Sequence, residues 1–145
     1  MLNLMLQGAF DSLQQVASEL RAVQDALDLQ LSNYGIVGSD RNLLRETRAQ
    51  SERTYLLRLL ADFEGRLTKL GPALTRPIVF VSSDGLATKL DRIGKSKGVN
   101  RTLRLEMDDK IREHRNELFH GRSPVPRVPF STTHQLMKAF LRECW

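Results

Sequence analysis

Apolar side chains recur every three or four residues along most of this chain, which is the spacing of one face of an α-helix. Four segments show this pattern clearly, and a shorter segment between them shows it more weakly. In chain order, the apolar stripes consist of Phe10, Leu13, Ala17, Leu20, Leu27 and Leu31; Leu56, Leu60, Phe63, Leu67 and Leu70; Leu86, Leu90 and Ile93; Leu103, Met107, Ile111 and Leu118; and Leu136, Met137, Phe140 and Leu141. We interpret these stripes as the core faces of packed helices.

Turn-forming and capping residues separate the stripes. The runs 33–35 and 38–40 predict a turn and a new helix cap before the second helix. That helix is expected over residues 41–70 and to end at Gly71-Pro72. The candidate caps of the later helices are Ser83 or Asp84, Asn100 and Ser131, and the predicted stop signals of the fourth helix are Gly121 and Pro124.

Two connecting segments are expected to lack helical structure. Residues 73–83 include Pro77 and the apolar run 78–81, and because no partner strand is visible elsewhere, they predict an extended connector. Residues 94–98 read Gly-Lys-Ser-Lys-Gly and predict a basic, flexible loop. The sequence therefore predicts a single all-α domain over residues 1–145, built as a bundle of four to five helices.

The charge of the chain is unevenly distributed. The formal net charge is +5, yet residues 1–40 hold one basic and five acidic residues, a balance of −4. The remaining 105 residues hold 21 basic and 12 acidic residues, a balance of +9. A basic body attracts polyanions through counterion release, although charge alone is equally compatible with simple solubility. Arginine outnumbers lysine sixteen to six, which leans toward phosphate recognition because guanidinium groups bind phosphate in a bidentate manner.

Several other functional classes lack their sequence signals. The apolar start, residues 1–6, is short and has no basic flank, so neither a signal peptide nor a membrane span is predicted. Cys144 is a single cysteine that cannot form an internal disulfide, which is compatible with a cytoplasmic location. The chain contains no phosphate-binding glycine loop, no nucleophile elbow and no Cys/His cluster. We therefore expect neither a metal ion nor a cofactor.

The end of the fourth predicted helix carries an unusual charged position. On a helical wheel, Arg115 falls about 40° from Ile111, beside the apolar stripe. A charge there must pair, line a cleft or face a subunit interface. His120 lies about 140° further around an ideal helix, but a helix that ends at Gly121 allows this histidine to swing back. The negative end of the helix favours the protonated imidazole.

The run Arg-Asn-Glu-Leu-Phe-His-Gly at 115–121 resembles the R-x4-H motif of the HEPN superfamily. The polar residue after the arginine and the glycine after the histidine are part of the resemblance. HEPN domains are helical bundles in which this motif closes a late helix and follows a long early helix. The resemblance implies an HEPN-like bundle and a metal-independent endoribonuclease, which activates the ribose 2′-hydroxyl and leaves a cyclic phosphate and a 5′-hydroxyl.

Within that resemblance, three polar residues of the motif have implied roles. His120 is the acid–base group, because acid–base catalysis near neutral pH requires a group that titrates near 7. Arg115 is the fixed cation for charge on the phosphoryl oxygens, and Asn116 holds the histidine or the substrate. Because cleavage requires both an acid and a base, a two-fold homodimer is expected to bring a second His120 to the same cleft. The candidate residues for holding the RNA backbone are Arg112, Arg122 and Arg127.

Other titratable side chains have plainer interpretations. Glu64 either pairs with and orients Arg115 or faces solvent. We expect His114 to be a hydrogen-bonded core residue and His134 to lie at the surface. Asp108 is expected to pair with Arg112, four residues further along the same helix.

The leading hypothesis is an HEPN endoribonuclease that acts as a toxin or a phage-defence effector, with RNA, a second copy of the chain and a possible antitoxin as partners. Some HEPN toxins carry a tyrosine two residues after the histidine as a modification target; here Arg122 stands at that position, so control of that kind is not expected. The alternative is a catalytically inactive HEPN-like module that binds nucleic acid or a protein partner. A subunit of a larger complex, docked through its acidic N-terminal region, is a third possibility.

Overall fold

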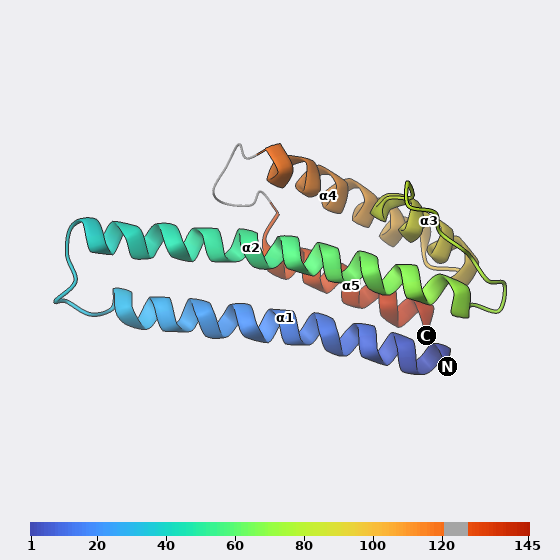
Figure 1. The fold of residues 1–145 in the computed structure, drawn as a ribbon, viewed down its shortest axis with the longest axis horizontal. Coiled ribbons are helices and arrows are strands. Elements are labelled where there is room, and N and C mark those ends of the chain that lie inside the picture. The colour runs from blue at the N-terminus through green and yellow to red at the C-terminus, as the bar shows by residue number, and fades with distance from the viewer. Residues whose placement is uncertain (121–127) are drawn as a thin grey trace.

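The computed structural model describes the backbone of residues 1–120 and 128–145, and the side chains of residues 1–114 and 128–145. Within these residues the chain forms α-helices and one short 3-10 helix, and no strand (Figure 1). The elements are α1 (Leu2–Leu31), α2 (Ser39–Leu70), the 3-10 helix η1 (Gly71–Ala73), α3 (Leu86–Lys97), α4 (Arg101–His120) and α5 (Phe130–Cys144). The predicted all-α class and the five helical segments are confirmed.

Helices α1 and α2 form a long antiparallel hairpin, and the other three helices cover one part of it (Figure 1). In the described part of the chain, α5 packs against each of the other four α-helices, so it lies at the centre of the bundle. The connector between η1 and α3 is extended, as the sequence predicts, and it turns the chain from α2 into the α3–α4 pair. This arrangement places α3 and α4 beside each other.

The core is built from the inner faces of these helices. Phe63 of α2 and Phe140 of α5 are fully buried and meet edge to face, with ring centroids 6.1 Å apart. Burying a side chain of this size stabilises a fold by roughly 1.5–3 kcal/mol. Met107 and Ile111 of α4 are also buried, which confirms the apolar register predicted for that helix. The side chain of Leu118 and the stop signals Gly121 and Pro124 lie outside the described residues.

The predicted loop at 94–98 is wrong, because α3 continues through it to Lys97. Gly94 is buried against α4 and α5, and a Cβ there would lie 2.5 Å from Cδ of Arg104. The glycine is therefore required for close helix packing rather than for flexibility. Gly98 ends the helix in the left-handed conformation, with φ of 67°, and its N–H donates to the last carbonyls of α3.

The predicted helix caps are only partly correct. Asn100 caps α4, because its side-chain oxygen accepts a hydrogen bond of 2.8 Å from the backbone N–H of Thr102. The N-cap of α3 is Gly85 rather than Ser83 or Asp84, since the Asp84 carboxylate instead accepts a hydrogen bond from the Val81 N–H.

The start of α5 also differs from the prediction. The helix begins at Phe130, after an N-cap at Pro129, and not with Ser131 as its cap. Its first N–H donates to the Glu52 carboxylate at 2.9 Å. A side chain from α2 therefore replaces the local cap, which the local sequence cannot indicate.

The far end of the α1–α2 hairpin extends beyond the other helices (Figure 1). No residue between 21 and 55 is buried, although this stretch includes several apolar side chains. The most exposed of them are Leu29, Tyr34, Val37 and Leu43. The start of α5 still meets this stretch at Glu52, whereas nearer the turn the described side chains of α1 and α2 are all at least partly exposed. In the part of the chain that the structure describes, no helix combines the length and the apolar character needed to cross a membrane.

Candidate nucleic-acid interface

The R-x4-H run lies in the last turns of α4, which is helical as far as His120. In a regular helix, a spacing of five residues separates Arg115 from His120 by about 7.5 Å along the axis and about 140° around it. The side chains of Arg115, Asn116 and His120 lie outside the described residues, as do Arg122 and Arg127 altogether. Their assignment to one site therefore stays a prediction, and so does the return of His120 toward Arg115.

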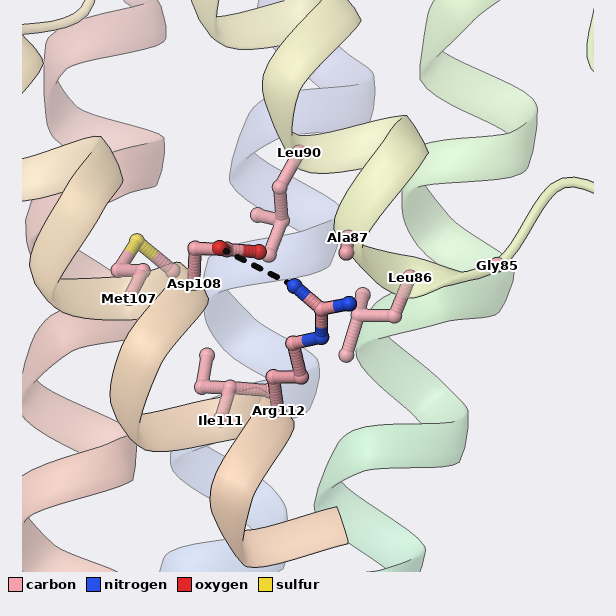
Figure 2. Close-up of a pocket in the computed structure, with 8 residues that line it drawn as sticks. All are labelled: Gly85, Leu86, Ala87, Leu90, Met107, Asp108, Ile111 and Arg112. Carbon is pink, nitrogen blue, oxygen red and sulfur yellow. Dashed lines mark ion pairs between the residues drawn. The ribbon is translucent and has the colours of Figure 1, made fainter. Parts of the chain in front are cut away.

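Arg112 is the one predicted RNA-binding residue whose side chain is described. It lies on α4 one turn before Arg115, and its guanidinium reaches across toward the first turn of α3 (Figure 2). Its Nη1 lies 3.9 Å from Oδ2 of Asp108, which confirms the predicted pair one turn apart. Because both side chains are substantially exposed, this pair contributes little to stability. The long distance leaves both groups able to bind another partner.

Arg112 and Asp108 stand at the edge of a cavity of about 230 Å³ between α3 and α4 (Figure 2). The remaining lining is almost entirely apolar and comes from both helices, namely Gly85, Leu86, Ala87, Leu90, Met107 and Ile111. Four of these side chains are buried core residues, so the cavity has a well-packed floor. An apolar pocket with a few polar groups at its edge is a typical small-molecule or base-binding arrangement.

A second, more polar cavity of about 440 Å³ adjoins the first along the same two helices. The two share lining residues, namely Ala87, Leu90, Met107 and Asp108. Lys95, Arg101 and Arg104 bring three positive charges to the second cavity, against the two negative charges of Asp91 and Asp108. Asp91 lies 2.9 Å from Nζ of Lys95 and 3.5 Å from Nη1 of Arg104. We call the two adjoining cavities the α3–α4 groove.

The sequence interpretation missed this groove. It treated the basic residues near 94–98 as loop residues, whereas the structure places Lys95 on a helix that faces Arg101 and Arg104 of the next one. The only sequence signal was the cluster of cations on both sides of the α3–α4 turn. Two antiparallel helices joined by a short turn bring such a cluster onto one surface.

Glu64 lies on α2, and its carboxylate accepts a hydrogen bond of 3.2 Å from Nζ of Lys89 on α3. Lys89 is buried, and its ammonium also lies 6.0 Å from the ring centroid of Phe80. This ion pair ties α3 to α2 and thereby fixes one wall of the α3–α4 groove. Because the side chain of Arg115 is not described, the proposed orientation of Arg115 by Glu64 stays a prediction.

The two described histidines are both buried. His114 is 1% exposed, which confirms the predicted core position. The surface position predicted for His134 is wrong, because it is 6% exposed and stacks on Phe130 at 5.9 Å. Burial, followed by the positive charge of Lys138, lowers the pKa of His134. The prediction failed because the first turn of α5 is covered by α1 and α2, a tertiary contact that a helical wheel does not contain.

Among residues 1–114 and 128–145, no three histidine, cysteine or acidic side chains gather in a group that could hold a metal ion. Cys144 is buried at the end of α5, and burial raises the pKa of its thiol to about 12. A thiol in that state is inert as a nucleophile near neutral pH. Trp145, the next residue, is half exposed.

Comparison of the chain with protein-family models, with curated proteins and with solved structures finds no match in any of the three.

Proposed function

We propose that this protein is a metal-independent endoribonuclease of the HEPN type, which acts as a homodimer in the cytoplasm as a toxin or a phage-defence effector. The observation that carries the proposal is the resemblance of 115–121 to the R-x4-H motif, in a run that ends a helix of an all-α bundle. In this mechanism His120 moves the proton of the ribose 2′-hydroxyl, and Arg115 neutralises the phosphoryl oxygens. Asn116 holds the imidazole or the substrate.

The charge of the bundle supports RNA as the substrate. Residues 41–145 carry a balance of +9, and part of that charge lies in the α3–α4 groove on the helix that bears the motif. Backbone phosphates bind such surfaces independently of sequence. Arg112, Arg122 and Arg127 are proposed to contact the RNA backbone near the scissile bond.

The proposed dimer follows from the chemistry. One motif supplies one titrating group, whereas phosphodiester cleavage uses an acid and a base. A two-fold axis through the cleft supplies the second His120 from the partner subunit. A mixed dimer that carries His120→Ala in one subunit and Arg115→Ala in the other therefore retains one Arg115 and one His120, which lie on different subunits.

The test is cleavage of cellular RNA by the purified chain in the presence of a chelator. We expect cleavage that leaves 2′,3′-cyclic phosphate ends in the wild type, and a loss of at least about a hundredfold in Arg115→Ala and His120→Ala. Asp109→Ala, an exposed change on the same helix, is the matched control and should retain activity. Cleavage that needs added metal, or that persists in both variants, contradicts the proposal.

The same variants identify the inactive-module alternative. In that case Arg115→Ala lowers the melting temperature as a structural ion-pair residue, while His120→Ala alters neither RNA nor the growth of cells that express the protein. An antitoxin or a larger complex is tested by copurification from the native host at low and high salt, because a partner of the acidic N-terminal region dissociates as salt increases.

A further inference from the structure

We infer that the apolar cavity between α3 and α4 binds a guanine base of RNA, and that Arg112 and Asp108 select it. The inference deepens the proposed function, because it assigns a base preference to the same helix that bears the proposed catalytic residues. It depends on the cavity and its polar edge, both of which lie within the described side chains.

The cavity has the size and surface of a base-binding site. Its volume of about 230 Å³ lies below the range of roughly 300–1,000 Å³ that is typical of pockets for drug-sized ligands. Leu86 and Leu90 line it from α3, and Met107 and Ile111 line it from α4 (Figure 2). A flat ring that rests on this apolar floor loses water from the face turned toward it, and the thioether of Met107 adapts to its shape. A single base is therefore the part of an RNA chain that fits.

The polar edge of the cavity is complementary to guanine. Guanine presents its O6 and N7 acceptors side by side, and an arginine binds this pair in a bidentate manner. Next to O6, the N1–H and the N2 amino group are two donors, which the two oxygens of one carboxylate can accept. Arg112 supplies the donors and Asp108 supplies the acceptors. The two residues lie one turn apart on α4, and Nη1 of Arg112 lies 3.9 Å from Oδ2 of Asp108.

The other bases match this edge less well. Adenine places its N6 amino donor where guanine has O6, so it opposes the donors of Arg112. Uracil offers a single ring N–H to the two acceptor oxygens of Asp108. Cytosine offers its N4 amino group to Asp108 but lacks the O6 and N7 acceptors of guanine for Arg112. Guanine alone engages both side chains fully, and each good bidentate pair is worth about tenfold or more in discrimination.

The rest of the α3–α4 groove provides a path for the adjoining phosphates. Lys95, Arg101 and Arg104 lie in the second cavity, which begins where the first one ends. In the other direction, Arg115 follows Arg112 by one turn, a rise of about 4.5 Å along α4. A base in the cavity would thus belong to a nucleotide near the scissile bond.

The experiment measures binding separately from cleavage. RNA pentamers that carry four uridines and one central G, A, C or U are titrated into full-length His120→Ala in chelator, with fluorescence anisotropy as the readout. We expect the G pentamer to bind at least about tenfold more tightly than the other three. Asp108→Asn should remove most of this preference, because the amide keeps only one acceptor. The matched control is Asp109→Asn, which makes the same change at the exposed neighbouring residue and should retain the preference.

Three outcomes overturn the inference. They are equal affinity for the four pentamers, a G preference that Asp108→Asn leaves undiminished, and GMP binding as tightly as the G pentamer. The last result would indicate a free nucleotide as the ligand. Thermal melts of each variant confirm that the fold is retained. If wild type fails to cleave RNA while His120→Ala discriminates G as expected, the nuclease proposal fails and the base site stands. If wild type cleaves without preference for G, the base site fails and the nuclease proposal stands.

Discussion

Replacing Gly71 with alanine tests how the connector closes over the end of α2. Gly71 has ordinary helical dihedral angles, φ of −51° and ψ of −53°, so its backbone conformation does not require glycine. A Cβ at this position would nevertheless lie 2.6 Å from the backbone oxygen of Ile78 and 2.7 Å from the ring of Phe80. The Ile78 N–H also donates to the Gly71 carbonyl at 3.0 Å. The connector is therefore held against this glycine by its backbone and cannot move aside cheaply.

Two opposing effects set the magnitude of this substitution. In a helical conformation, alanine is favoured over glycine by about 0.5–1 kcal/mol. Overpacking against a fixed neighbour costs about 1–3 kcal/mol. Because the nearest atom belongs to the backbone, we expect the second effect to dominate, with a net loss of about 1–2 kcal/mol in the free energy of unfolding. In a domain of this size that loss lowers the melting temperature by about 2–8 °C.

The matched control is Gly65→Ala on the same helix. A Cβ at Gly65 meets no atom within 4 Å, so the gain in helix propensity is unopposed. We expect Gly65→Ala to raise the melting temperature by about 2–4 °C. The assay is thermal and urea unfolding followed by circular dichroism. A Gly71→Ala protein as stable as Gly65→Ala would refute the reasoning, because it would show that the connector gives way without cost.

Three further predictions concern buried polar groups. Lys89→Ala should lower the free energy of unfolding, measured in urea, by about 1–3 kcal/mol, because the partly buried Glu64 carboxylate loses the Lys89 ammonium. Replacing Lys89 by Met and Glu64 by Leu together should restore part of this loss. The pKa of His134 is lowered by burial, so the unfolded chain takes up a proton first as pH falls below about 6.5. Stability should therefore decrease from pH 7.5 to 5.5 in wild type and less so in His134→Gln; parallel pH profiles would contradict this. Cys144, with a pKa of about 12, should resist a disulfide reagent at pH 8 until guanidinium unfolds the chain.

The periodicity of apolar residues was enough to predict the helices, because every apolar stripe packs into the same core. The stripe that contains Phe63 and the stripe that contains Phe140 were both visible, and these rings meet in the structure. The errors fall where a distant element overrides local signals. Gly94 indicated a loop, yet it lies within α3, where Arg104 and Phe140 approach it closely. His134 occupied the polar start of a helix, yet α1 and α2 cover it.

The candidate site was predictable only as a local motif. The Arg115–His120 spacing and the Asp108–Arg112 pair each lie within one helix, so helical periodicity alone predicts them. The α3–α4 groove depends on how two helices pack, and its apolar floor looked like ordinary core in the sequence. The Glu64–Lys89 pair joins residues 25 positions apart, and no periodicity connects them.

The unsupported end of the α1–α2 hairpin implies that resistance to local opening differs along these two helices. Between residues 25 and 47 no described side chain is buried, whereas Leu56 and the residues that follow lie under α5 and α3. Amide protons of the first group should exchange with deuterated solvent well before those of the second, and a protease should cut near Tyr34 while the remainder stays folded. The hairpin end would then unfold and refold as a separate cooperative unit while the α3–α4 groove stays intact.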